Sequence, residues 1–366
     1  MTTMAIDNKE KEVLNVPPLR FPEFTGEWQC KAIEKVAPLQ RGFDLPTQNL
    51  VEGIYPVIYS NGILQHHDKY KCEAPGLITG RSGTIGKFTY IDSGFYWPHN
   101  TSLWVTDFCG NCPKFIYYLY QTVHIEQFST GSGVPTLNRN DVHRYKTSVP
   151  TAIVEQEKIA KFLSILDERI VTQNKIIEDL NKLKSAISEC IFNSIKGDVV
   201  MLSEICDIVK GKQINGEYLS ESGEYYVMNG GTEPSGYYSE YNVKANTISI
   251  SEGGNSCGYV QFNNFPFWSG GHCYSLQNIA DIVDNLYLYH YLKSKEEAIM
   301  KLRIGSGLPN IQKKDLAMFK TIVPLFEQQI TISTFLSSLE RKAEIEERIL
   351  NVMQKQKLYL LQQMFI

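Results

Sequence analysis

The stretch GSGVPTLNRNDVHRYKTSVP at residues 131–150 returns in similar form as GSGLPNIQKKDLAMFKTIVP at residues 305–324. The matching positions lie 174 residues apart, for example from Gly131 to Gly305. Solenoid repeats are only about 20–50 residues long, so this period is too long for a solenoid. The chain is therefore predicted to hold one globular domain followed by one long helix, both duplicated, in a pseudo-twofold arrangement.

A heptad-patterned segment follows each copy of the repeat, with apolar residues at alternating steps of three and four, as in a coiled coil. Two positions of this heptad pattern are polar in both segments: Gln173 and Lys184 in the first, Glu346 and Lys357 in the second. Because polar residues in a seam fix register, the two helices are expected to pack on each other as an antiparallel pair. The predicted apolar seam consists of Ile159, Leu163, Leu166, Ile170, Ile177, Leu180, Ile187, Ile332, Leu336, Leu339, Leu350, Met353, Leu360 and Met364.

These patterns divide the chain into five parts. A polar tail at 1–12 precedes a globular domain at 13–150 and a long helix at 151–196, and the second domain and helix occupy 197–324 and 325–366. The predicted fold class is α+β, with two mixed α/β domains joined and separated by the two antiparallel helices.

Short elements are predicted inside both domains. Glycine-bounded runs rich in β-branched and aromatic residues predict strands. These are GIYPVIYS, GLITG, GKFTYI, SLWVTD and YKTSVP in the first domain, and TISISEGG and GYVQF in the second. Helices are predicted at 29–37, 112–128, 202–209 and 284–302.

Composition sets further limits on the function. The chain is 43% hydrophobic and 21% charged, as in ordinary globular proteins, and no apolar run reaches the roughly 18–20 residues of a membrane helix. The first residues contain no apolar core of a signal peptide, so a cytoplasmic location is expected. The net charge of −4 argues weakly against nucleic-acid binding, although a local basic face matters more than the total.

Motifs that carry chemistry are missing from the sequence. We find no P-loop, dinucleotide fingerprint, methyltransferase signature, nuclease pattern or zinc-protease motif. Of the 8 cysteines, only Cys109 and Cys112 form a C-x-x-C pair, and no second pair stands at zinc-finger spacing. The chain is therefore predicted to be non-catalytic, with no metal site and no cofactor of its own.

Four features together resemble the specificity subunit of Type I restriction–modification systems. They are the lead-in PPLRFPEFTGEW, the G-S-G-x-P turn, the K-T-x-V-P strand and the helix start EQEKIAKFLSILDERI, in the order domain, helix, domain, helix. The resemblance covers about residues 17–366. One departure is visible: the second helix start, FEQQITISTFLSSLE, carries one extra residue between Glu and Phe, which affects the detail of the second docking surface.

The resemblance implies a function and a set of partners. In that family each target recognition domain binds one half of a bipartite double-stranded DNA sequence. The helices set the spacer and dock two methyltransferase subunits, and restriction subunits complete the enzyme. Any S-adenosylmethionine, ATP and Mg²⁺ are expected on those partner subunits.

Candidate DNA contacts are side chains that donate hydrogen bonds to base edges or phosphates. Domains that bind different half-sites are expected to differ where they touch bases, whereas shared motifs hold the frame. The candidates lie in the glycine-rich loops and beside the G-S-G-x-P turns. They are Arg81, Ser82, Thr84, Lys87, Thr130, Ser132, Asn138 and Arg139 in the first domain, and Asn255, Ser256, Lys301, Arg303, Ser306, Asn310 and Lys313 in the second.

Two other functions remain open at this stage. One alternative is a coiled-coil scaffold whose two domains bind proteins and not DNA. A third, weaker alternative is an independent nuclease or methyltransferase, against which the missing motifs count.

Overall fold

The structure is a computed structural model that describes residues 15–131, 133, 135–305, 307 and 309–366. The predicted tail at 1–12 and the candidates Ser132 and Ser306 lie outside the described residues. The chain divides into two compact units, one ending at Gln173 and including Ile349–Ile366, the other formed by Asn174–Arg348. Each unit therefore combines one globular domain with a part of both long helices.

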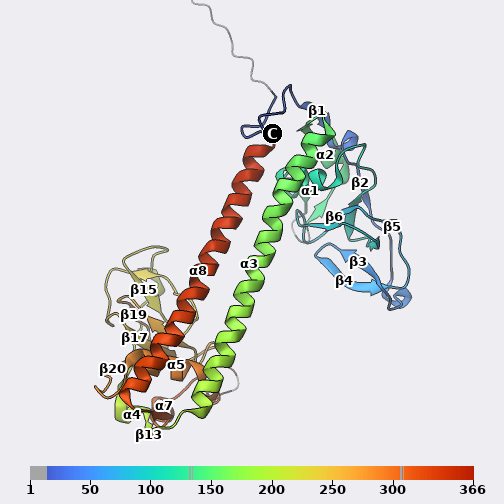
Figure 1. Cartoon of the computed structure of the whole chain (residues 1–366). Helices are drawn as coiled ribbons and strands as arrows, with labels where there is room; N and C mark the ends of the chain where they lie inside the picture. The colour runs from blue at the N-terminus through green and yellow to red at the C-terminus, as the bar shows by residue number, and fades with distance from the viewer. Residues whose placement is uncertain (1–14, 132, 134, 306, 308) are drawn as a thin grey trace, which may run out of the picture. The chain divides into compact units, whose positions relative to one another are not determined.

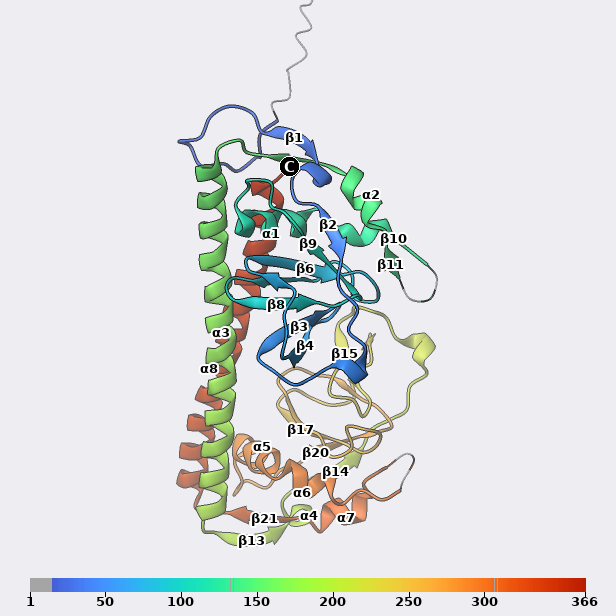
Figure 2. The same cartoon turned by 90° about the vertical axis from the view of Figure 1, so that its right-hand side faces the viewer.

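The long helices are α3 (Ile153–Ser194) and α8 (Phe326–Met364). The first unit places the beginning of α3 beside the end of α8, and the second unit places the end of α3 beside the beginning of α8 (Figures 1 and 2). This is the antiparallel pairing predicted from the heptads. Every residue of the predicted apolar seam is buried or half-buried.

The first residues of the two long helices show where the one-residue difference between the repeats lies. Ile153 and Phe326 begin the two helices 173 residues apart, whereas Pro150 and Pro324 are 174 apart. The extra residue of the first copy therefore lies in the loop between the proline and the helix. The extra residue counted between Glu and Phe in the second helix start arises because Glu327 is not the counterpart of Glu155.

Each domain has its own central sheet, and the two sheets have the same topology. The four strands have the order β2-β9-β6-β7 in the first unit and β14-β20-β17-β18 in the second, and all neighbouring strands are antiparallel. The strands are β2 (Leu39–Arg41), β9 (Ser102–Val105), β6 (Gly76–Gly80) and β7 (Phe88–Ile91), and correspondingly β14 (Asp207–Lys210), β20 (Cys273–Gln277), β17 (Thr247–Ser251) and β18 (Val260–Asn263). The duplication seen in the sequence is thus a duplication of topology.

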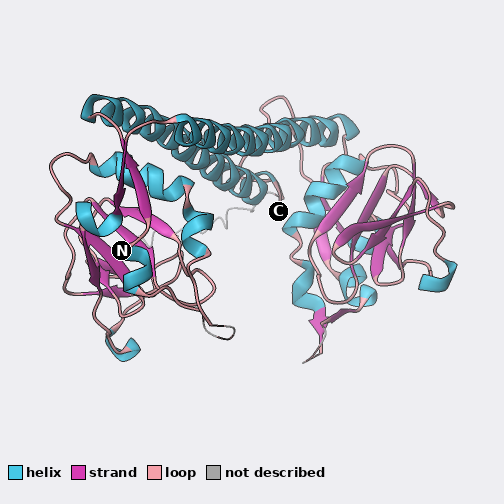
Figure 3. Ribbon diagram, turned by 90° about the horizontal axis from the view of Figure 1, so that it is seen from below, coloured by secondary structure: helices cyan, strands magenta, loops and turns pink. Residues whose placement is uncertain are grey.

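Smaller sheets complete each domain, and Figure 3 shows the strands of each unit gathered together. The first unit has β4 (Gly62–His67), β3 (Tyr55–Tyr59), β8 (Phe95–Pro98) and β5 (Cys72–Glu73), and the second has β16 (Tyr237–Tyr238), β15 (Tyr225–Met228) and β19 (Trp268–Ser269). Two-stranded ladders join the ends of each domain: β1 (Gln29–Ala32) with β12 (Lys146–Val149), and β13 (Asp198–Met201) with β21 (Lys320–Val323). A further ladder pairs β10 (Ser129–Thr130) with β11 (Thr136–Leu137).

Short helices complete the two domains. The helices α1 (Pro113–Thr122) and α5 (Asn285–Ser294) supply buried aromatic residues to the two main cores. Those cores also include the seam residues Leu163 and Leu336, so each domain packs directly on the helix pair. The remaining helices are α2 (Arg139–Arg144), α4 (Leu202–Ile205), α6 (Glu296–Met300), α7 (Lys313–Ala317) and the 3-10 turns η1 (Ile33–Lys35), η2 (Thr47–Asn49), η3 (Ile125–Phe128) and η4 (Gly216–Tyr218).

Two predicted helices are corrected by the structure. Residues 29–37 form strand β1 and then only the turn η1, because Gln29–Ala32 pair with β12 more than a hundred residues away. Residues 202–209 form the single turn α4 and then enter β14, because Asp207–Lys210 pair with β20. In both places long-range strand pairing overrides a local apolar pattern.

A buried glutamine attaches each domain to its long helix. Gln156 donates to the backbone carbonyl of Pro150 and to the side-chain oxygen Oδ1 of Asn111, both at 2.9 Å, and accepts from the backbone amide of Cys112 at 2.8 Å. Cys112 is the residue that caps the start of α1, so the glutamine joins α3, α1 and the end of β12. Gln156 is 2% exposed, and its bond to Pro150 is buried, while its bonds to Cys112 and Asn111 are partly buried.

Gln329 repeats this arrangement in the second unit. It donates to the carbonyls of Pro324 at 2.9 Å and Ile282 at 3.0 Å, and accepts from the amide of Asp284 at 2.8 Å. Asp284 caps the start of α5, and Gln329 is 0% exposed. We call Gln156 and Gln329 the glutamine latches.

A second repeated contact crosses the helix seam. In the first unit Lys357 Nζ lies 2.6 Å from Asp167 Oδ1, and Tyr118 donates its hydroxyl to Asp167 Oδ2 at 2.8 Å. Burial, with a smaller contribution from Asp167, raises the pKa of Tyr118, so its hydroxyl stays protonated. The predicted polar position Lys357 is therefore paired with a carboxylate across the seam.

The counterpart in the second unit uses Lys184, Glu340 and Tyr289. Lys184 Nζ and the Tyr289 hydroxyl both lie 3.2 Å from Glu340 Oε1. In each unit, the domain helix and the two long helices thus meet on one carboxylate.

Candidate nucleic-acid interface

A hollow of about 650 Å³ in the first unit gathers four of the predicted DNA contacts: Arg81, Thr130, Asn138 and Arg139. Its lining is dominated by groups that donate hydrogen bonds. The other polar lining residues are Gln40, Arg41, Asp44, Thr136 and Asn140. A surface with three arginines and one aspartate is locally basic although the chain as a whole is acidic.

Sheet topology explains why these residues meet. Since β2 and β6 both run antiparallel to β9, they run parallel to each other and end at the same edge of the sheet. Arg41 is the last residue of β2, and Arg81 directly follows β6. The Arg81 amide donates to the carbonyl of Thr101 at 2.9 Å, which fixes the loop to the beginning of β9.

The end of the G-S-G-x-P motif, at Pro135, lies against this loop. The Leu137 amide donates to the carbonyl of Arg81 at 2.8 Å, and the Gly83 amide donates to the carbonyl of Pro135 at 3.0 Å. Both backbone groups of Arg81 are therefore bonded, and its position is set by the sheet and the turn together. The shared motif acts here as frame.

The second unit repeats this backbone frame with Glu252 in the place of Arg81. The Glu252 amide donates to the carbonyl of His272 at 2.9 Å, and the Ile311 amide donates to the carbonyl of Glu252 at 2.8 Å. The Gly254 amide donates to the carbonyl of Pro309 at 3.0 Å, as Gly83 does to Pro135. Arg81 and Glu252 are consequently equivalent positions that carry opposite charges.

The side chains at the two equivalent positions behave differently. Arg81 is half-buried, and within the part of the chain that the structure describes its guanidinium forms no hydrogen bond or ion pair. Glu252 is only 7% exposed, and its Oε1 lies 2.5 Å from Lys210 Nζ and accepts from the Tyr274 hydroxyl at 3.2 Å. Its Oε2 faces His272 Nδ1 at 3.7 Å.

Sequence reasoning missed Arg41, Lys210, Glu252 and His272. Arg41 and Lys210 both end the first strand of the central sheet, and each precedes a glycine. A Cβ atom on Gly42 would lie 2.2 Å from the carbonyl oxygen of His99, and Gly211 has the same closeness to Gly270. The repeated pair of a basic residue and an obligatory glycine is the signal in the sequence that would have found both positions.

The other predicted contacts are scattered. Thr84 and Lys87 are exposed on the loop after β6, where Lys87 reaches the carbonyl of Asn61 at 3.5 Å. Lys301 does not join the group, because it lines a different hollow with Asn181 and Ser185 of α3. In the second unit the remaining described candidates lie in the loop after β17 and around the turn that leads into α7: Asn255, Ser256, Arg303, Asn310 and Lys313. Ser82 forms a β-bridge with Thr136 in the first unit, as Gly253 does with Asn310 in the second.

Among the described residues, no group of three or more His, Cys, Asp or Glu side chains is placed to hold a metal ion. No helix in the described parts of the chain is long and apolar enough to cross a membrane.

Comparisons with known proteins agree on one family. The family model for the Type I restriction modification DNA specificity domain matches twice, at residues 25–182 and 196–355. A type I specificity subunit of Mycoplasma pneumoniae is 33% identical over 156 residues, which cover 42% of this chain and 41% of that protein. One from Mycoplasma genitalium is 23% identical over 308 residues, covering 78% and 80% of the two chains. The crystal structure of a Type I S subunit from M. genitalium shares the fold, with a TM-score of 0.70 at 20% identity, over 96% of this chain and 99% of that one.

Proposed function

Because this chain belongs to the Type I restriction modification DNA specificity family, we propose that each of its domains binds one half of a bipartite double-stranded DNA target. The observation that carries this proposal is the repeated frame with different side chains at its edge. Two domains with one backbone arrangement suit the repeated geometry of DNA, and side chains that differ suit two different half-sites. The protein contributes specificity, and the methylation chemistry belongs to partner subunits.

The long helices fit the role of a spacer. With 42 residues at 1.5 Å per residue, α3 is about 63 Å long. One turn of DNA is about 34 Å, so a helix of this length is sufficient for half-sites separated by about one turn or somewhat more. The base pairs between the half-sites need no contact with the protein.

The same helices offer surface for two methyltransferase subunits. Exposed apolar residues recur at equivalent places on α3 and α8: Phe162 with Phe335, and Ile176 with Ile349. Exposed apolar groups on otherwise polar helices are typical of protein interfaces. The repetition supports two like partners, which would carry S-adenosylmethionine, and restriction subunits with ATP and Mg²⁺ would join them.

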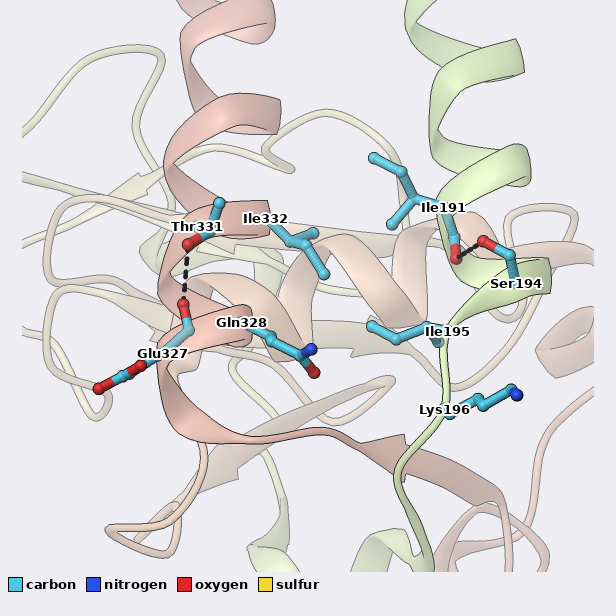
Figure 4. Close-up of a pocket in the computed structure, with 8 residues that line it drawn as sticks. All are labelled: Ile191, Ser194, Ile195, Lys196, Glu327, Gln328, Thr331 and Ile332. Carbon is cyan, nitrogen blue, oxygen red and sulfur yellow. Dashed lines mark hydrogen bonds between the residues drawn. The ribbon is translucent and has the colours of Figure 1, made fainter.

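A hollow of about 620 Å³ adds to this surface in the second unit. Figure 4 shows it between the end of α3, with Ile191 and Ile195, and the beginning of α8, with Gln328 and Ile332. The hollow is lined by both helices, so a partner seated there would contact the helix pair and not one helix alone.

The methylome of a host that carries the chain and its methyltransferase partner tests the proposal. We expect methylation at one bipartite motif, and replacement of residues 13–150 by another recognition domain should change one half of that motif only. Absence of bipartite methylation would contradict the proposal, and a change in both halves would contradict the division of labour between domains. The alternative of a protein-binding scaffold is not supported by the family assignment, and it predicts no salt-dependent DNA binding.

The docking surface has its own test. The Phe162→Ala and Phe335→Ala double variant should weaken binding of the methyltransferase subunit in titration calorimetry. Both side chains are exposed, although Phe162 also has an edge contact with Phe21, so the unfolding temperature of the isolated chain should fall only slightly.

A further inference from the structure

We propose that Arg81 binds a guanine in the first half-site, and that its equivalent Glu252 gives the second domain a different recognition chemistry. The inference rests on the proposed DNA-binding function and deepens it, because it names the residue and the base. It follows from comparing three pairs of equivalent positions at the edge of the two central sheets.

Two of the three pairs keep their charge. Arg41 and Lys210 both end the first strand of the sheet, and Arg139 and Lys313 both begin the short helix after the G-S-G-x-P turn. Phosphates are the same in every DNA sequence, so contacts to them favour the same charge in both domains. We therefore assign these shared basic residues to the DNA backbone.

The third pair reverses its charge. Arg81 and Glu252 hold the same place in the frame, as their matched backbone hydrogen bonds show. A basic residue in one domain and an acidic one in the other cannot both serve a phosphate. A position that differs within a shared frame is the position expected to distinguish the half-sites.

The chemistry of Arg81 selects guanine. Its guanidinium is unpaired among the described residues and borders the basic hollow, so its donors are available to a ligand. A guanidinium donates two parallel hydrogen bonds, which match the O6 and N7 acceptors of guanine in the major groove. Of the neighbouring arginines, Arg41 is paired with Asp44 at 3.2 Å, which sets it apart from Arg81.

Glu252 has a different task in the second domain. It is buried, and its carboxylate holds Lys210 and lies beside His272, which are 52% and 62% exposed. Lys210 is presented to the DNA backbone, and His272 is the side chain available to a base, both beside the Glu252 carboxylate. Thr101 stands in the place of His272 in the first domain and is engaged with His99 at 3.0 Å, so the two domains present different groups at this position too.

The test compares Arg81→Gln with Arg139→Gln in the chain assembled with its methyltransferase partner. Methylation rates are measured on duplexes in which each base pair of both half-sites is changed in turn. For Arg81→Gln we expect discrimination to fall roughly 5- to 150-fold at one G·C pair of the first half-site, with the second half-site unchanged. For Arg139→Gln we expect weaker binding to all duplexes, with the slope of log affinity against log salt reduced by about 1.

Several results would overturn the inference. They are a uniform loss of binding for Arg81→Gln with no relaxed base pair, a relaxed pair in the second half-site, a first half-site without G·C, and unchanged specificity. Arg81→Lys is the control for misfolding, because it keeps the positive charge and loses only the two parallel donors. It too should relax discrimination at the same base pair. If the wild-type assembly itself methylates no bipartite motif, the proposed function fails. If it does and both Arg81 variants keep full specificity, only this inference fails.

Discussion

The glutamine latches make a prediction that can be worked through from their contacts. Substituting Gln156 by Leu keeps the approximate volume but leaves the Cys112 amide and the Pro150 carbonyl without partners. A buried backbone group without a partner costs about 1–3 kcal/mol, so two of them should lower the free energy of unfolding of the first unit by roughly 2–6 kcal/mol. For a unit of this size each kcal/mol corresponds to roughly 2–4 °C, which predicts a decrease in unfolding temperature between roughly 4 and 24 °C.

The second latch supplies the matched experiment. Gln329→Leu should destabilise the second unit and leave the first largely unaffected, whereas Gln156→Leu should do the reverse. Hydrogen exchange followed by mass spectrometry on peptides from α1 and α5 separates the two units. The neighbouring Glu157→Gln is the control, since Glu157 is exposed and should change stability by less than about 0.5 kcal/mol. The reasoning is refuted if Gln156→Leu costs less than about 1 kcal/mol, or if either latch variant loosens both units equally.

Two further predictions concern an ion pair across the seam and a buried histidine of α5. Lys357→Glu should destabilise the first unit by about 1–3 kcal/mol, because it brings a second carboxylate against Asp167, and adding Asp167→Lys should recover part of that loss in a double-mutant cycle of thermal unfolding. Burial lowers the pKa of His290 below its usual 6.5, so the native state binds fewer protons than the unfolded state in that range. Its contribution to stability should be complete above pH 6.5 and be lost as the pH falls through the lowered pKa. Between pH 7.5 and 5 the free energy of unfolding should accordingly depend less on pH for His290→Gln than for the unchanged chain. An equal pH dependence would argue against this assignment.

Local periodicity explains which parts of the fold could be predicted. The heptad positions and the strands around GLITG and TISIS carry their own hydrophobic pattern, so both were identified from sequence. The helix predicted at 29–37 failed because its first residues pair with β12, which no local window contains. The same limitation hid part of the site: Arg41 and Arg81 are 40 positions apart in sequence and meet only through the strand order β2-β9-β6.

The cross-seam ion pairs imply that the two helices can be lengthened only together. Asp167 and Lys184 are 17 residues apart on α3, and their partners Lys357 and Glu340 are 17 residues apart on α8. A heptad inserted between Asp167 and Lys184 alone leaves the two helices unequal, so one ion pair is lost or the shorter helix is strained. A second heptad between Glu340 and Lys357 restores both pairs.

The doubly extended chain should therefore remain stable and recognise a longer target. Seven residues add about 10.5 Å of helix, which corresponds to about three base pairs at 3.4 Å each, so the methylated motif should keep both half-sites and gain about three base pairs of spacer. The singly extended chain should unfold at a lower temperature and methylate poorly. If the single insertion is as stable as the double one, or if the double insertion leaves the spacer unchanged, the ion pairs do not set the register of the helices.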